Sequence, residues 1–133
     1  MKKDIPMPPV EDVAIAIVKE EEDAQAAWTA YIVNLKEEPL RNVLITSSGY
    51  GELEGKPRKT STLRHFFDEI GALDFFKIEP VMDFTFGLSN EYWVSFQLGE
   101  VMYDKRYVFL PETIKEDNAT SVPLIGKKGV MIV

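Results

Sequence analysis

The chain has 133 residues, which is enough for one domain whose hydrophobic core needs neither disulfides nor metal. Its composition, 45% apolar and 28% charged, is typical of a folded globular protein, and the absence of cysteine excludes disulfides, thiolate zinc sites and cysteine nucleophiles. The formal net charge of −7 argues against non-specific binding to nucleic acid, which requires a basic surface.

The N-terminal segment, residues 1–11, is rich in proline and is expected to be extended. Two lysines stand near its start, but no apolar stretch follows them as a signal peptide requires. No stretch of the chain is long and apolar enough for a transmembrane helix. We therefore expect a cytoplasmic protein without a membrane partner, with a single domain over residues 12–133.

The first half of the domain is predicted to form strands. Residues 13–19, "VAIAIVK", are a short apolar run rich in β-branched residues, and its length favours a strand buried on both faces over a buried helix segment. Residues 27–36 and 40–48 predict two more strands, the second with Val43 and Ile45 on one face and Leu44 on the other. Residues 49–61, "GYGELEGKPRKTS", contain three glycines and a proline and predict a loop, either a long flexible hairpin or a connecting segment.

Residues 62–70 fit two structures. The apolar residues from Leu63 to Ile70 have helical spacing, with Thr62 available as a cap and Gly71 as an end. The same residues also fit a strand, followed by a turn and a further strand at "FFKIE", residues 75–79. The surrounding β-rich sequence favours strands, so we expect at most one short helix here.

Residues 90–111, "NEYWVSFQLGEVMYDKRYVFLP", predict a hairpin. Gly99-Glu100 is a Gly-X pair typical of a type II′ turn, which places Leu98 opposite Val101. Continued along the strands, this register pairs Trp93 with Arg106 on a mostly polar side. The apolar side then holds Tyr92, Phe96, Tyr103 and Tyr107.

Lys105 does not fit this alternation, because it falls on the apolar side opposite Val94. Either its ammonium reaches solvent past the edge of the sheet, or a bulge near "YDKR" shifts the register. The apolar Val108 and Leu110 that follow favour the bulge.

The chain ends with a turn at "GKKG" and a strand over Val130–Val133. Four apolar terminal residues need to be paired and covered, and burial within the monomer is the favoured interpretation. An uncovered strand would present an edge to a protein partner or to a second copy of the chain.

Few residues point to catalysis or to a cofactor. The glycine-rich loop matches neither the dinucleotide-binding motif nor the P-loop, since the third glycine is one residue late and Pro57 follows Gly55-Lys56. His65 is the single histidine, which argues against a zinc site and against a catalytic triad. We expect no metal and no cofactor.

Carboxylates offer a weak case for a hydrolase. Most acidic residues lie in runs beside turns, which is typical of solvated surface. Asp83, with apolar neighbours on both sides, and Glu79 are the candidates for a carboxyl group in an apolar pocket, where a catalytic acid is tuned.

Two groups of residues are candidates for binding. The Trp93–Arg106 pair joins the residue types most enriched at interaction hot spots. A basic cluster that would dock an acidic partner or a phosphorylated ligand, unless it is only a solvated loop, contains Lys56, Arg58, Lys59 and Arg64. Exposed aromatics for a small ligand or a carbohydrate would be Trp93, Trp28 and Tyr50.

The stretch "VNLKEEPLRNVLITSSGYGE" followed by "EIGALDFFKIEP" resembles immunoglobulin-like β-sandwich domains of bacterial proteins. The resemblance covers Tyr31–Pro80, implies a fold, and carries no catalytic residues with it. We therefore expect an all-β, antiparallel two-layer sandwich of about seven or eight strands. Its expected function is a non-enzymatic protein-interaction module, with a ligand or carbohydrate binder as the alternative and a hydrolase as the least favoured.

Overall fold

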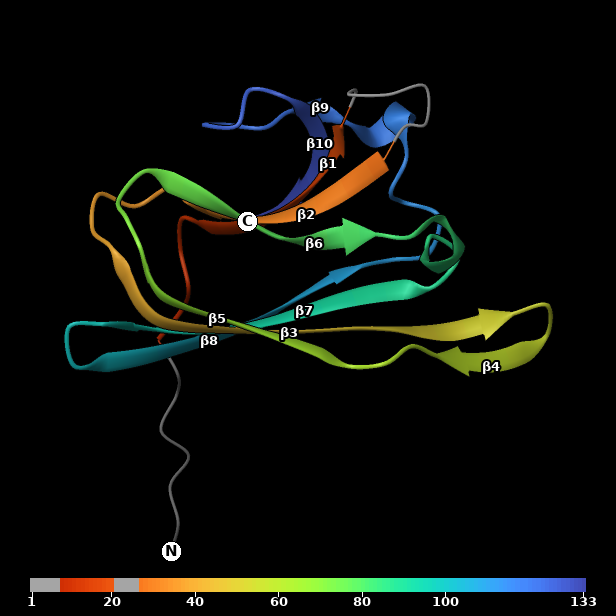
Figure 1. Cartoon of the computed structure of the whole chain (residues 1–133), viewed down its shortest axis with the longest axis horizontal. Coiled ribbons are helices and arrows are strands. Elements are labelled where there is room, and N and C mark those ends of the chain that lie inside the picture. The colour runs from red at the N-terminus through yellow and green to blue at the C-terminus, as the bar shows by residue number, and fades with distance from the viewer. Residues whose placement is uncertain (1–7, 21–26) are drawn as a thin grey trace, which may run out of the picture.

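The computed structural model describes residues 8–20 and 27–133, and in them the chain forms two stacked antiparallel sheets (Figure 1). The first sheet has the order β6-β2-β1-β10-β9. Its strands are β1 (Val13–Glu20), β2 (Ala27–Asn34), β6 (Asp74–Val81), β9 (Thr120–Ser121) and β10 (Lys128–Ile132). The second has the order β4-β3-β7-β8, with β5 also paired to β3. Its strands are β3 (Leu40–Leu53), β4 (Lys56–Lys59), β5 (Leu63–Ile70), β7 (Ser89–Leu98) and β8 (Val101–Phe109).

The all-β sandwich expected from the sequence is confirmed. The described residues contain ten strands rather than seven or eight, partly because β4 and β9 are very short. Their helical elements are two single 3₁₀ turns, η1 (Asp83–Thr85) and η2 (Glu116–Asn118), and no helix among them could cross a membrane. Most of the proline-rich segment, residues 1–7, lies outside the described part, but Val10 near its end packs against the core.

Strand β1 is buried on both faces, as its unbroken apolar sequence predicts. One face, with Ile15 and Ile17, joins the main core between the sheets. The other face, with Ala14, Ala16 and Val18, packs in a second cluster. The loop before β10 covers this outer face with Val122 and Ile125, so β1 has no solvent-facing side.

Of the two forms expected for residues 49–61, the hairpin is confirmed, but its arms are regular strands rather than a loop. Strand β3 continues to Leu53 and turns back into β4, which makes the long hairpin arm at the right of Figure 1. Glu54 and Gly55 both have positive φ, 53° and 74°, as a two-residue type I′ turn requires. Gly49, the first of the three glycines in this stretch, allows close packing, because a Cβ at this position would lie 3.1 Å from Thr60 Cγ2.

Residues 63–70 form a strand, β5, and the favoured interpretation is confirmed. β5 pairs with β3 from Leu63 opposite Ser47 to Ile70 opposite Leu40. After a turn in which Leu73 has φ 53°, the chain crosses to the other sheet as β6. Phe67 of β5 stacks on Phe76 of β6 with ring centroids 5.6 Å apart, so these two edge strands meet across the sandwich.

The β7–β8 hairpin has the register that its turn predicts. The pairing runs without interruption from Leu98–Val101 to Asn90–Phe109. The bulge expected near residues 103–106 is therefore wrong. Lys105 instead stays on the inner side of β8, an edge strand, with its Nζ 5.0 Å from the centre of the Tyr107 ring. An inward-pointing charge on an edge strand is tolerated because its end reaches solvent, and it discourages edge-to-edge association.

The C-terminal strand is paired within the chain. β10 begins at Lys128, pairs with β1 from Gly129 to Ile132, and pairs with β9 at Lys128 and Gly129. The outer edge of β10 that β9 leaves uncovered is thus limited to its last three residues, Val130–Ile132.

Candidate functional site

The outer face of the second sheet presents a tryptophan to solvent. Trp93 on β7 is 43% exposed and lies opposite Arg106 of β8, whose guanidinium carbon is 5.8 Å from the indole ring centre. The indole nitrogen donates a hydrogen bond to Asp104, which also accepts one from Ser95. The ring is therefore exposed and at the same time held in one orientation.

Two further exposed apolar side chains lie on the same face of the sheet as Trp93. Leu44 and Phe66 are register partners on β3 and β5, and they are 40% and 59% exposed. Leu44 is also the partner of Ser95, the residue two positions from Trp93 on the same face. We call this surface the Trp93 face, and it consists of Leu44, Thr46, Arg64, Phe66, Trp93, Ser95, Asp104 and Arg106.

The Trp93 face carries charges of both signs, with Arg64 and Arg106 on one side of the balance and Asp104 on the other. Arg106 Nε lies 3.7 Å from Glu91, a half-buried carboxylate that also accepts a hydrogen bond from the Tyr50 hydroxyl. Burial and this hydrogen bond raise the pKa of Tyr50. Arg64, by contrast, has no ion pair within the described residues. The face therefore mixes arginines and carboxylates on a molecule of net charge −7.

The structure divides the predicted basic cluster. Lys56, Arg58 and Lys59 are exposed on β4, on the arm, and Arg58 and Lys59 line a hollow of about 410 Å³ beneath it. Arg64 instead belongs to the Trp93 face, where it pairs with Thr46, the partner of Trp93. Arg106 stands three strands away from Arg64, so the cluster and Arg106 do not merge into one basic patch.

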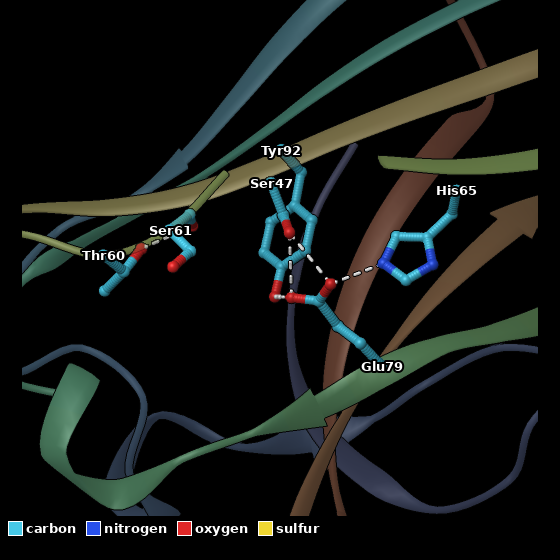
Figure 2. A network of polar contacts seen from close by, with 6 residues as sticks. All are labelled: Ser47, Thr60, Ser61, His65, Glu79 and Tyr92. Carbon is cyan, nitrogen blue, oxygen red and sulfur yellow. Dashed lines mark hydrogen bonds and ion pairs between the residues drawn. The ribbon is translucent and has the colours of Figure 1, made fainter. Parts of the chain in front are cut away.

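A second polar arrangement lies between the sheets (Figure 2). Glu79 of β6 points across to the second sheet, where Ser47 Oγ donates to its two oxygens at 2.8 and 3.0 Å. His65 Nε2 lies 2.7 Å from Oε1, and the Tyr92 hydroxyl lies 3.4 Å from Oε2. Burial, followed by the nearby Glu79 carboxylate, raises the pKa of Tyr92 above its ordinary value.

This arrangement is not a catalytic triad. In a triad the histidine stands between the nucleophile and the acid, whereas here Ser47 and His65 both contact the acid. Asp83, the other candidate carboxylate, is exposed on η1 and is therefore not the buried catalytic acid considered from the sequence. Among residues 8–20 and 27–133, no group of three or more acidic or histidine side chains is placed to hold a metal ion.

The Glu79 carboxylate borders a cavity of about 230 Å³. Met82, Phe84 and Thr85, from the segment 82–88, form part of its wall. Thr85 holds this segment by donating to the Met82 carbonyl, and Asn90 by donating to the carbonyls of Thr85 and Leu88. Thr60, Ser61 and Phe84 border both this cavity and the hollow beneath the arm. Sequence reasoning singled out Glu79 but missed Ser47, whose one local signal is a hydroxyl on the otherwise apolar inner face of β3.

The aromatics expected to bind a ligand do not share one site. Trp28 is 6% exposed and packs edge-on against Phe86, with ring centres 6.1 Å apart, so it belongs to the core. Tyr50 is half-buried and bonded to Glu91. Trp93 is the one of the three that is open to solvent.

Comparison of the chain with models of known protein families finds no match, and comparison with curated proteins finds none either. The resemblance to immunoglobulin-like domains therefore stays a prediction, and function has to be argued from the site itself.

Proposed function

We propose that the protein is a non-enzymatic interaction module, that its contact surface is the Trp93 face, and that its partner is a second copy of the chain. The observation that carries the proposal is the exposed Trp93 ring, which is held by Arg106 and Asp104 and shares its sheet face with the exposed Leu44 and Phe66.

Apolar surface that stays exposed to water costs free energy that burial would recover. Exposed apolar side chains are common singly, but a contiguous group on one sheet face is typical of a binding surface. Tryptophan and arginine carry much of the binding energy at protein interfaces. Because Trp93 is already fixed by Asp104 and Arg106, it would lose little rotational freedom on binding.

The charge pattern favours a second copy as the partner. The strand register places Arg106 in one row across the sheet, with Trp93 and Thr46, and Asp104 in the next row, with Ser95 and Leu44. A two-fold axis across the strands, between these two rows, brings Arg106 of each copy over Asp104 of the other. Such self-complementarity is what a two-fold symmetric dimer requires.

Sedimentation equilibrium over a wide range of protein concentration tests the proposal. The wild-type chain is expected to shift from monomer to dimer as its concentration rises, and the Trp93→Ser variant is expected to remain monomeric. Phe84→Ser is the matched control, because Phe84 is more exposed than Trp93, at 68%, but lies on η1 away from this face. A monomer at every concentration would overturn the proposal, as would equal effects of the two variants.

The sequence also led us to expect self-association through the C-terminal strand and a cytoplasmic location. Self-association through the C-terminal strand is less favoured than the Trp93 face, because β1 and β9 already pair with most of β10. The cytoplasmic location expected from the sequence is retained as part of the proposal.

A further inference from the structure

The Glu79 cavity lies on the inner side of the second sheet, opposite to the Trp93 face, and has a chemistry of its own. Its carboxylate is 14% exposed and receives its hydrogen bonds from two hydroxyls and one imidazole. Within the described residues, no lysine or arginine forms an ion pair with Glu79. Its one ion-pair partner among these residues is the imidazole of His65, which carries a charge only when protonated, so the carboxylate makes the cavity attractive to a positively charged group.

The rest of the cavity is suited to hydrocarbon. Leu63, Met82 and Phe84 line it while remaining 49%, 55% and 68% exposed, so apolar surface surrounds the approach to the carboxylate. A ligand that covers these side chains removes their apolar surface from water. At about 230 Å³ the space fits a small molecule, in a site that combines apolar walls with a few fixed polar groups.

We infer that this cavity binds a small organic cation, with Glu79 receiving the ammonium group and Leu63, Met82 and Phe84 packing against its hydrocarbon part. Ser47 and Tyr92 hold the carboxylate in place, and Glu79 faces the cavity between them and the wall formed by segment 82–88. The inference is independent of the proposed dimer, since the two surfaces lie on opposite sides of the second sheet.

Titration with phenethylammonium, monitored by backbone amide chemical shifts, tests this binding site. Phenethyl alcohol is the matched neutral probe, with the same ring and chain. The ammonium is expected to shift the signals of Ser61, Leu63 and Phe84 and to bind about tenfold more tightly than the alcohol, since a hydrogen bond to a charged group contributes more than a neutral one. Equal affinity for both probes, or no shift with the ammonium, would overturn the inference.

Two variants locate the effect at Glu79. Glu79→Gln removes the charge and is expected to reduce the ammonium affinity to that of the alcohol.

A surface variant gives a second measurement, because Glu79 is part of a half-buried network. Leu63→Lys places a cation at the exposed edge of the cavity and is expected to weaken ammonium binding at least about tenfold. The control is Leu124→Lys, which makes the same change of charge at an exposed residue of the loop before β10. This variant is expected to leave the ammonium affinity unchanged. Equal weakening by the two lysine variants would contradict the inference, and so would undiminished ammonium binding by a folded Glu79→Gln variant. Trp93→Ser is expected to bind the ammonium normally.

Discussion

The hydroxyl of Tyr107, on β8, donates a hydrogen bond to the carbonyl of Val13, at the start of β1, over 2.5 Å. This buried bond joins the two sheets directly, because β8 and β1 belong to different layers. Burial raises the pKa of Tyr107, so its hydroxyl keeps its proton and remains a donor well above neutral pH. The inner side of the hairpin thus contributes a polar link as well as apolar surface.

Replacing Tyr107 by phenylalanine is expected to lower the free energy of unfolding by about 1–2 kcal/mol, since a buried carbonyl loses its hydroxyl donor while the ring still fills its place. Urea denaturation measures the change. Tyr103→Phe is the control, because Tyr103 also lies on the inner side, stacked on Phe96, and its hydroxyl has no hydrogen bond within the described residues. Equal losses in the two variants would show that the Val13 bond contributes nothing of its own.

Gly129→Ala is expected to destabilise the fold by about 1–3 kcal/mol, the usual cost of overpacking a core. A Cβ at this position would lie 2.7 Å from the Ile17 carbonyl oxygen and 3.0 Å from Val18 Cα, and neither backbone atom can move aside easily. The effect is measured as a shift in the urea midpoint. Gly71→Ala is the matched control, where the nearest atom is Asp74 Oδ2 at 3.7 Å, and an equal shift there would contradict the packing argument.

Glu20 is expected to make stability depend on pH. Burial acts against its charged form, yet hydrogen bonds from Lys127 and Tyr31, both 2.6 Å long, hold the pKa of Glu20 below its ordinary value of 4.5. A lowered pKa stabilises the folded state fully above 4.5, and this contribution is lost as the pH falls through the folded-state pKa. Glu20→Gln should therefore be less stable than the wild type near neutral pH. The difference between the two unfolding free energies should shrink below pH 4.5, and a constant difference would refute this role.

The sequence allowed the hairpin to be predicted in detail because its register depends on local geometry. Once Gly99-Glu100 is assigned as the turn, the pairing of Trp93 with Arg106 follows from the two-residue period of strands. Gly99 has φ 58°, as the first central residue of a type II′ turn requires. The exposure of Trp93 follows from the same alternation.

The surroundings of Lys105 and of Glu79 could not be predicted from the sequence, because they depend on the order of the strands in the sheets. Lys105 indicated a bulge because alternation does not reveal that β8 is an edge strand, where an inward lysine still reaches solvent. The Glu79 site joins Ser47 and His65 of the second sheet to a carboxylate of the first. No local pattern predicts that these strands face one another. The glycines of residues 49–61 indicated a flexible segment for a similar reason, since close packing at Gly49, the turn at Gly55 and flexibility all favour glycine.

The most direct test of the proposed interface is acrylamide quenching of tryptophan fluorescence at increasing protein concentration. Trp28 is 6% exposed and contributes little quenching, so the measurement reports mainly on Trp93, which is 43% exposed in the single chain. If two copies associate through the Trp93 face, quenching should fall as the concentration rises, and Phe84→Ser should behave in the same way. Quenching that stays the same at every concentration would contradict the interface.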